Sequence, residues 1–324
     1  MAKMVVTIFS ALIACIAQAQ YTVEILHYAR WPQSGCFGAG AGQQVGWAGN
    51  YFFRAILWRG GGEPHVGARS TTSSLRATMW SSSRESWVDL HPLAYPLSWA
   101  NGISGNVQVG YGNPNPQGPG YTHALLWRGT ASSVTVLHPP GADSSEAYAT
   151  DGTQHVGYVS SSQQQEHAAL WEGPTQRFVD LNPPGYHLSI AMGVAKGQQV
   201  GLAAFHGSGH AALWRGTRES FVDLNPAPSE YNGSRANATN GAVQVGRAAV
   251  SGPPWGLQYV AAAWRGTRQS HLNLHQFLPK DYQGYLVGAE SEARGIDADG
   301  VIVGWARHLP TNTHHAVVWR PIRR

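Results

Sequence analysis

Charged residues are scarce in this 324-residue sequence: Asp, Glu, Lys and Arg together make up 12%, about half the usual share. Lysine is nearly missing, so arginine carries almost all of the net charge of +4. No run of basic residues is longer than the C-terminal RPIRR, and no basic stripe is available for nucleic acid. The sequence predicts a mildly basic surface without a nucleic-acid partner.

Cysteine is also scarce, since only Cys15 and Cys36 occur. Cys15 lies in an N-terminal segment that we expect to be removed, which leaves Cys36 alone. A single cysteine excludes an intramolecular disulfide, even in an oxidising compartment that would permit one. Stability therefore has to come from packing.

Residues 1–19 are typical of a secretory signal peptide. Lys3 precedes an apolar run over residues 5–16, and AQA at residues 17–19 offers a small-x-small cleavage site. The apolar run is too short to span a bilayer. The alternative is a bacterial lipobox, LIAC, which would make Cys15 a lipid anchor. Both routes predict export, either as a secreted protein or to the cell envelope.

Glycine, proline and tryptophan are abundant instead, with 39, 19 and 13 residues. Hydrophobic residues make up 43% of the chain, which does not match the composition of a disordered protein. Glycine and proline favour turns, and tryptophan supplies large aromatic anchors. The composition predicts a turn-rich β protein.

The sequence repeats itself. HAALWRGTRESFVDLNP at residues 210–226 nearly copies HAALWEGPTQRFVDLNP at residues 167–183. A Val-Gly pair begins at positions 45, 66, 109, 156, 200, 245 and 303, and each pair precedes an apolar run that ends in tryptophan. These tryptophans are Trp58, Trp80, Trp127, Trp171, Trp214, Trp264 and Trp319. Most pairs lie 43 to 47 residues apart, a spacing typical of propeller blades.

Each full repeat predicts four strands. The first carries Ser-x-Ala, as in Ser189 to Ala191, and a two-residue turn ending in glycine leads into the second strand with the Val-Gly pair. The third is of the type HAALW, and the fourth is of the type FVDL. Four antiparallel strands in every repeat predict an all-β chain with one β-propeller domain over residues 20–324.

Strand counts predict six blades. Ser-x-Ala strands occur six times, with Ser34 to Cys36 as a variant, whereas Val-Gly and tryptophan strands occur seven times. The chain ends on a third strand, and residues 22–46 align with residues 178–201, so the N-terminal strand should supply the missing outer strand and close the ring. An extra hairpin over residues 64–80 accounts for the surplus. Seven blades, one of them truncated, is the alternative.

The repeat resembles the HAF-type extracellular repeat, named for His-Ala-Phe before Leu-Trp. His-Ala precedes Trp127, Trp171, Trp214 and Trp319, and SEARGIDADGVIVGWA at residues 291–306 resembles the Ser-x-Ala stretch of that family. The Phe position departs from the pattern and holds Leu125, Ala169, Ala212 and Val317. The resemblance covers nearly the whole mature chain and implies an exported repeat protein, without catalytic residues.

The long connections should lie on one face of the propeller. They cover residues 27–33, 91–97, 111–122, 182–188, 225–233, 247–259 and 275–290. Loops on a rigid scaffold commonly bind ligands, and aromatic side chains with polar tips suit sugars or protein hot spots. The candidate binding residues are Tyr28, Trp31, Tyr95, Tyr186, His187, Tyr231, Trp255, Tyr282 and Tyr285. The alternative is that these side chains fill loop cores or gaps between blades.

Sequence motifs for chemistry are weak. The repeated histidines occupy equivalent places in different blades, too far apart to share one metal ion, so we expect no metal and no cofactor. No nucleophile elbow, zinc-protease helix or phosphate loop occurs. Glu146 and Glu292 each stand between Ser and Ala of a first strand, but the equivalent residues elsewhere form no matched carboxylate pair.

We therefore expect a secreted or cell-surface, non-enzymatic repeat protein that is a monomer without a membrane span. It should bind a glycan or a protein through its long-loop face. One alternative is a carbohydrate-active propeller enzyme of glycosidase or lyase type, using Glu146 or Glu292 with Arg235 and Arg294. The other is a purely structural envelope component.

Overall fold

The protein was studied as a computed structural model. It describes residues 21–26, 33–40, 43–49, 53–58, 65–70, 75–80, 86–115, 121–162, 164–173, 175–205, 207–226, 231–252, 256–283 and 290–322. The expected signal peptide and the lipobox cysteine Cys15 lie outside the described residues. Within those residues, no helix has the length and apolar character needed to cross a membrane.

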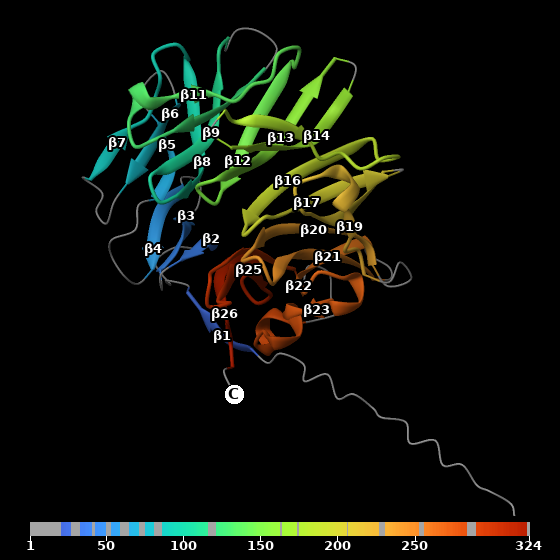
Figure 1. Ribbon diagram of the computed structural model, residues 1–324. Helices are drawn as coiled ribbons and strands as arrows, with labels where there is room; N and C mark the ends of the chain where they lie inside the picture. Colours follow the sequence, from blue (N-terminus) through green and yellow to red (C-terminus); the bar gives the residue numbers. More distant parts are fainter. Residues whose placement is uncertain are drawn as a thin grey trace, which may run out of the picture.

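The chain is an all-β protein built from antiparallel sheets, five with four strands and two with three in the described residues. Successive sheets fan out in chain order, from blue to red in Figure 1. One sheet contains β8 (Leu97–Ser104), β9 (Val107–Asn113), β10 (His123–Trp127) and β11 (Thr135–Val136). The next contains β12 (Ser144–Thr150), β13 (Gln154–Ser161), β14 (Gln164–Glu172) and β15 (Arg177–Asp180).

The remaining sheets repeat this plan. A third four-stranded sheet contains β16 (Leu188–Ala195), β17 (Gln198–Phe205), β18 (Ser208–Trp214) and β19 (Val222–Asp223). A fourth contains β20 (Tyr231–Thr239), β21 (Gln244–Gly252), β22 (Gly256–Trp264) and β23 (Leu272–Asn273). The three-stranded sheets contain β2 (Gln33–Gly40), β3 (Gln43–Gly49) and β4 (Phe53–Trp58), and β5 (His65–Ser70), β6 (Leu75–Trp80) and β7 (Trp87–Asp89).

The last sheet joins the two ends of the chain. Its order is β24 (Ser291–Ile296), β25 (Ile302–His308), β26 (Thr313–Pro321) and β1 (Tyr21–Ile25). β1 pairs antiparallel with β26, from Tyr21 opposite Pro321 to Ile25 opposite Val317, and lies beside it in Figure 1. The N-terminal strand is therefore the outer strand of the last sheet, in the register expected from the sequence.

From β8 through β24 to β2, the first strands of successive sheets contact one another, whereas the short fourth strands lie at the far edges of their sheets. We call β2, β8, β12, β16, β20 and β24 the inner strands. Their tight turns into the second strands follow the turn chemistry of the sequence. At the turn after β16, for example, Lys196 and Gly197 have φ of 51° and 75°, the left-handed region that a two-residue hairpin needs.

In five repeats the glycine of the Val-Gly pair permits a close backbone approach, whereas Gly67 meets only the Trp80 ring, at 3.5 Å. Gly201 of β17 lies opposite Ala191 of the inner strand. A Cβ built on Gly201 would come within 1.9 Å of the Ile190 carbonyl oxygen and 2.9 Å of the Ala191 Cα. Gly157 and Gly246 show the same approach. The repeated glycine is therefore required by packing between first and second strands, although its own φ is not in the left-handed region.

The serine of each Ser-x-Ala strand links two neighbouring sheets. Its Oγ accepts a hydrogen bond from the backbone N–H of an alanine on the third strand of the preceding sheet. The pairs are Ala77 to Ser98, Ala124 to Ser145, Ala168 to Ser189, Ala211 to Ser234, Ala261 to Ser291 and Ala316 to Ser34, at 2.9 or 3.0 Å. The last of these bonds joins the C-terminal strand to β2, near the start of the chain.

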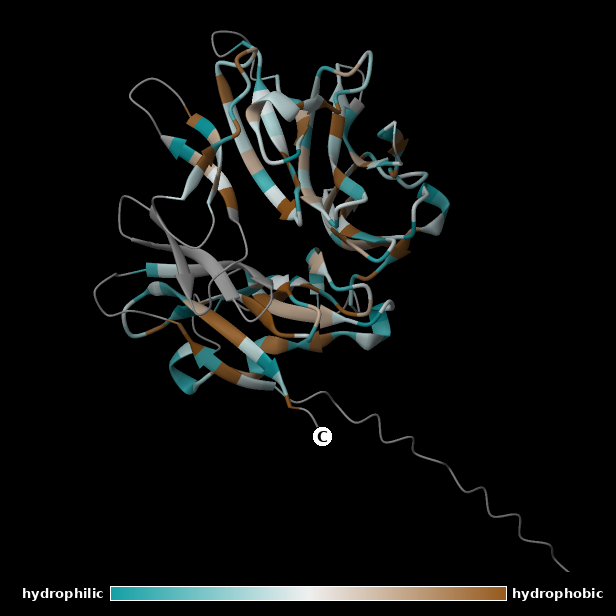
Figure 2. Cartoon of the chain, turned by 60° about the vertical axis from the view of Figure 1, so that its left-hand side comes forward, coloured by the Kyte–Doolittle hydropathy of each residue, from teal (hydrophilic) through white to brown (hydrophobic). Residues whose placement is uncertain are grey.

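The core lies between the sheets and is built around tryptophan. Apolar residues, brown in Figure 2, lie mostly in the strands, and many of the turns are polar. The repeated tryptophans on β10, β14, β18, β22 and β26 are fully buried. Trp214, for example, belongs to one buried cluster with Ala168 and Leu170 of the preceding sheet. All seven predicted tryptophans and Val-Gly pairs fall on third and second strands, respectively.

One local expectation was wrong. Residues 247–259 were expected to form a long connection, but they belong largely to β21 and β22, which pair from Gln244 opposite Trp264 out to Gly252 opposite Gly256. The Gly-Pro-Pro-Trp-Gly turn signal sits only at the tip of this extended hairpin. The turns between third and fourth strands contain short 3-10 helices, such as η2 (Arg218–Ser220) and η3 (Arg268–Ser270).

Candidate functional site

The residue between Ser and Ala of each inner strand occupies the same position in every repeat. These residues are Trp99, Glu146, Ile190, Arg235 and Glu292 in the strands from β8 onward. Each lies opposite the residue after the Val-Gly pair, which is Tyr111, Tyr158, Leu202, Arg247 and Trp305, respectively. Opposite residues of an antiparallel pair project from the same face of the sheet, so the two side chains of each pair lie next to each other. Ionisable side chains cluster around two of these positions, Glu292 and Glu146.

The first group is an arginine cluster around Glu292, whose carboxylate is fully buried. Arg235 Nη2 lies 2.5 Å from Glu292 Oε1, and Arg294 Nη2 lies 2.9 Å from Oε2. Asn237 Nδ2 donates to Oε1 at 2.9 Å. Arg247 Nη1 is farther away, at 3.9 Å from Oε2. Three guanidinium groups thus surround one carboxylate, at a junction between β20, β21 and β24.

Glu292 stays ionised in this cluster. Burial alone would raise its pKa, but the charges of Arg294, Arg235 and Arg247 outweigh burial and hold the pKa of Glu292 below its usual range. Arginine is always protonated in proteins. The cluster therefore carries three positive charges against one negative charge, an excess of positive charge in a mostly buried place.

Arg247 is the least satisfied member of the cluster. Its guanidinium stacks on Tyr259, with Cζ 4.0 Å from the ring centroid, and its side chain is 26% exposed. Within the described residues, no hydrogen bond holds this guanidinium; it stacks on Tyr259 and lies near the carboxylate of Glu292 and the like charges of Arg235 and Arg294. Its donors are thus oriented by a ring but remain unused.

The second group is centred on Glu146 and is rich in tyrosine. Thr122 Oγ1 donates to Glu146 Oε1 at 3.3 Å, and the hydroxyl groups of Tyr148 and Tyr158 lie near enough to this carboxyl to lower its pKa. Burial raises the pKa of Glu146, and the hydrogen bonds offset only part of that rise. Tyr111 lies close enough to Glu146 for the carboxylate charge to raise its pKa further, beyond the effect of burial. This group carries little net charge compared with the arginine cluster.

Serine and histidine also meet in three places, an arrangement that in hydrolases activates a nucleophile. His91, His138 and His275 place Nδ1 at 2.7 to 2.8 Å from Ser98, Ser145 and Ser291. These serines are buried, and each already accepts the interstrand bond from an alanine N–H. In two other sheets an asparagine takes the place of histidine, with Ser189 donating to Asn182 and Ser234 to Asn225. The pairs therefore orient structural serines.

This equivalence predicts the effect of His275→Asn on acid stability. Burial lowers the pKa of His275 to about 4, whereas an unfolded chain takes up this proton near pH 6.5. The unfolded state therefore binds more protons between these values, and stability is lost as the pH falls from about 6.5 to 4. Without this histidine, the decrease in the free energy of unfolding on acidification should be smaller by up to about 3 kcal/mol.

Urea unfolding of both proteins at pH 8 and pH 4.5 measures this difference. We expect the His275→Asn protein to match the parent within about 1 kcal/mol at pH 8 and to lose less stability on acidification. An equal loss in both proteins would contradict the assignment. Wild-type loss will also include His155 and His271, whose pKa values burial lowers to about 4.

The expected loop aromatics are not gathered into one surface in the described residues. Tyr95 is buried, and its hydroxyl contacts His123 Nδ1 at 3.2 Å. Tyr282 is likewise buried, 2.7 Å from His315 Nδ1. Tyr186 is half-buried against Phe221. These three side chains fill gaps beside the sheets, as the alternative interpretation of the loops describes.

The remaining candidates divide into two sets. His187 is exposed, and Tyr231 is half-buried against the His271 ring, with centroids 4.8 Å apart. Tyr28, Trp31, Trp255 and Tyr285 lie outside the described residues. The binding role of all nine residues stays a prediction.

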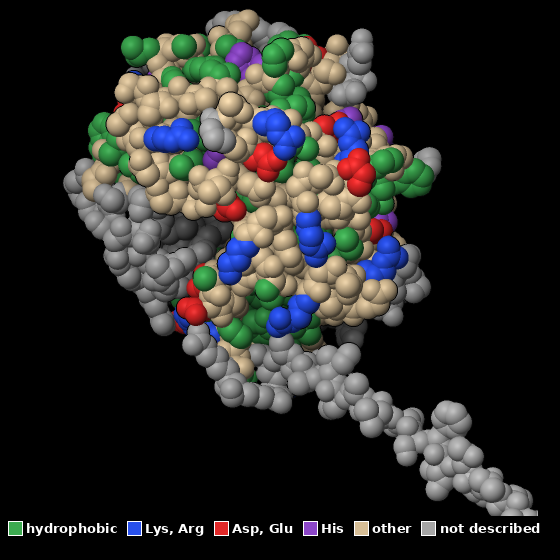
Figure 3. All heavy atoms as spheres, in the orientation of Figure 1, with side chains coloured by type: hydrophobic (Ala, Val, Ile, Leu, Met, Phe, Trp, Pro, Cys, Tyr) green, Lys and Arg blue, Asp and Glu red, His purple; other side chains and the backbone are tan. Residues whose placement is uncertain are grey.

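The repeated histidines are held by different partners. His167 and His210 lie near the aspartates of their own fourth strands, at 3.3 Å from Asp180 and 3.1 Å from Asp223. The described residues contain no group of three or more His, Cys, Asp or Glu side chains placed to hold a metal ion. On the face shown in Figure 3, basic and acidic side chains are interspersed.

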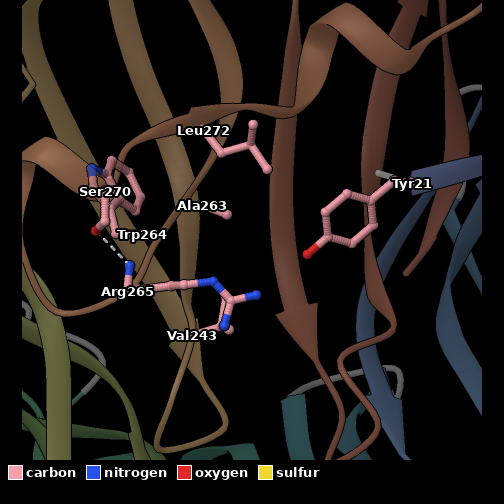
Figure 4. A pocket seen from close by; sticks show the side chains of 7 residues that line it. All are labelled: Tyr21, Val243, Ala263, Trp264, Arg265, Ser270 and Leu272. Carbon is pink, nitrogen blue, oxygen red and sulfur yellow. Dashed lines mark hydrogen bonds between the residues drawn. The ribbon is translucent and has the colours of Figure 1, made fainter. Parts of the chain in front are cut away.

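A small cavity of about 20 Å³ lies away from both clusters, between the last two sheets. Tyr21 of β1 faces Arg265 and Leu272 across it, and Val243, Ala263, Trp264 and Ser270 complete the lining (Figure 4). This volume is about that of a single water molecule. The cavity is therefore a packing gap behind the N-terminal strand and is too small for an organic ligand.

Comparisons with known proteins identify the class of fold. No family model matches the sequence, and no curated protein matches it. Among solved structures, the chain is similar to a puromycin hydrolase at a TM-score of 0.50 and 14% identity, over 90% of this chain and 52% of that one. It is also similar to a prolyl endopeptidase, at a TM-score of 0.47 and 12% identity, over 90% of this chain and 51% of that one. A third similar structure is TolB from Acinetobacter baumannii, at a TM-score of 0.45 and 9% identity, over 74% of this chain and 62% of that one.

These neighbours are β-propeller proteins, and the chain shares their fold. It spans about half the length of the hydrolase and endopeptidase chains. The expectation of a glycan- or protein-binding scaffold acting through its long-loop face was wrong, because the solved structure that this chain resembles is a puromycin hydrolase. The burial of Tyr95 and Tyr282 agrees with this correction, since two of the aromatics expected on that face are core residues.

Proposed function

We propose that this chain is a peptidase-related propeller that holds a peptide against the ends of its inner strands, between the Glu146 and Glu292 groups. The proposal assigns peptide binding to this chain and no bond cleavage. It is supported by the extent of the fold similarity to the puromycin hydrolase, which covers 90% of this chain.

One observation carries the proposal. The position between Ser and Ala holds an exposed aromatic residue, a tyrosine-lined acid and an arginine cluster on different inner strands of one propeller. Trp99 is 36% exposed although it lies on an inner strand, and Arg235, Arg247 and Arg294 each retain between 19% and 34% exposure. A peptide offers apolar side chains and charged ends, which match such a surface.

Peptide binding should be measured by the fluorescence anisotropy of dye-labelled oligopeptides of about six residues. We expect Trp99→Ala to weaken binding about tenfold or more, because a partly exposed tryptophan in a binding surface contributes strongly. Trp87→Ala is the matched control, since Trp87 is 43% exposed but lies on the outer strand β7. Binding in the control should stay at the wild-type level.

A labelled oligosaccharide of similar size completes the experiment. Binding of the oligosaccharide in place of the peptides would contradict the proposal. Equal effects of Trp99→Ala and Trp87→Ala on peptide binding would contradict the placement of the site on the inner strands. Chromatography of the incubated peptides reports any cleavage separately.

We also propose that the sheets close into one six-bladed propeller over residues 20–324. The inner strands and the outer strands (β1, β7, β11, β15, β19 and β23) each number six in the described residues, and an inserted hairpin accounts for the surplus of second and third strands. The pairing of β1 with β26 and the bond from Ala316 to Ser34 support closure through the chain ends.

Export of the protein is part of the same proposal. It rests on the signal-like sequence of residues 1–19 and on the resemblance to the HAF-type extracellular repeat. Mass spectrometry of the protein from the culture supernatant and the envelope fraction would test it. A mature N-terminus at Gln20 is expected, and a full-length chain retained in the cytosol would contradict export.

A further inference from the structure

We infer that Arg247 is a carboxylate-binding residue and receives a carboxylate of the bound peptide, either its C-terminus or an acidic side chain. This inference rests on the proposed function and names the chemistry of one end of the site. Neither the sequence repeats nor the fold comparison points to this residue.

The position of Arg247 explains why its charge is uncompensated. Arg247 of β21 lies directly opposite Arg235 of β20. Like charges in opposite positions of a strand pair repel each other, and the single nearby carboxylate, Glu292, is closer to Arg235 and Arg294 than to Arg247. A further anion beside Arg247 would balance this excess of charge.

The geometry of Arg247 also suits a planar anion. The stacking on Tyr259, with Cζ 4.0 Å from the ring centroid, fixes the plane of the guanidinium. A guanidinium held in one plane presents parallel N–H donors that match the two oxygens of a carboxylate. Since no hydrogen bond uses those donors in the described part of the chain, binding an anion does not require breaking an existing hydrogen bond, and the only carboxylate beside Arg247 there lies 3.9 Å away.

Glu292 has a second role in this arrangement. Its buried carboxylate holds Arg235 and Arg294 in place, and Asn237 donates to the same carboxylate and to the Ala293 carbonyl oxygen. Arg235, Arg294 and Asn237 are therefore held in fixed positions beside Arg247 by their contacts with Glu292. A site supported in this way keeps its geometry before the ligand arrives.

The test compares three dye-labelled peptides of one sequence: a free C-terminal acid, the C-terminal amide, and an amide with one internal glutamate. The wild-type protein should bind at least one carboxylate-bearing peptide about tenfold more tightly than the neutral amide. The acid and the glutamate peptide distinguish the two sources of the carboxylate. In the Arg247→Met variant the preference for carboxylate-bearing peptides over the neutral amide should disappear.

Two further variants control the experiment. Arg265→Met removes an exposed arginine at the far end of β22 and should leave the preference intact. Arg247→Lys keeps the charge but loses the planar fork, so the preference should fall to an intermediate level. Thermal unfolding of each variant confirms that the protein is folded before binding is measured.

The outcomes separate the two proposals. If all three peptides bind equally and Arg247→Met changes nothing, the inference about Arg247 is overturned while peptide binding stands. If no peptide binds, the proposed function fails and the inference fails with it. Inorganic phosphate is added alone as a final probe, and saturable binding that no peptide acid displaces would reassign the site to phosphate and overturn the inference.

Discussion

Replacing Gly201 with alanine should destabilise the protein by about 3 kcal/mol or more, or prevent folding. The added methyl group would lie 1.9 Å from the Ile190 carbonyl oxygen, well inside van der Waals contact. The atom that it meets is backbone in the paired inner strand, so no side-chain rotation relieves the clash. The two strands would have to separate, which breaks the pairing of β16 with β17.

Gly209→Ala is the matched control for this prediction. Gly209 lies on the next strand, β18, and a Cβ there meets only Leu202 Cδ1 at 3.8 Å, which is ordinary contact. Its effect on urea unfolding should stay within about 1 kcal/mol. If the two variants were equally stable, the close approach of first and second strands would not be the reason for the repeated Val-Gly pair.

Glu292→Gln should be the most disruptive single change in the arginine cluster, costing about 3 kcal/mol. The substitution leaves Arg235, Arg247 and Arg294 facing one another without a carboxylate. Their partial exposure screens part of the repulsion, which places the expected cost at the lower end of the range for broken buried ion pairs. Added salt should restore part of the lost stability, because it screens like charges.

Glu172→Gln provides the comparison at the surface. Glu172 pairs with Arg177, whose side chain is 67% exposed, so its loss should cost less than about 1 kcal/mol. Urea unfolding at low and high salt measures both variants. If Glu292→Gln were as stable as Glu172→Gln and insensitive to salt, the cluster would not depend on its buried carboxylate.

Much of the fold could be predicted because the strands and turns of each repeat are marked by residues close together in the sequence. Val-Gly pairs, tryptophans and turn glycines mark the second strand, the third strand and the hairpins, and the alignment of residues 22–46 with residues 178–201 predicts the pairing of β1. What the Val-Gly glycine does could not be predicted, since Gly201 is explained only by the position of Ile190 on the paired strand. The strand length of β21 and β22 was also missed, because turn residues at the hairpin tip resembled a longer loop.

The site was harder to predict for a physical reason. Alternation correctly groups Glu146, Arg235 and Glu292 on one face of their strands, but it does not say which neighbours meet across sheets. Arg235 and Glu292 are 57 residues apart and come together only when two sheets pack. Arg247 was not predicted to be part of this cluster, because residues 247–259 were expected to form a loop. A histidine or an asparagine recurs after the fourth strands and orients the Ser-x-Ala serines. This recurrence is visible in the sequence but was not used to predict the contacts.

Photo-crosslinking with an oligopeptide that carries a benzophenone group, followed by mass spectrometry of the labelled protein, locates the peptide site most directly. We expect the label on the inner strands and their neighbours, namely β8, β12, β20, β21 and β24, and we expect excess unlabelled peptide to prevent labelling. Labelling confined to the long connections, such as residues 91–96 or 181–187, would contradict a peptide site at the inner strands.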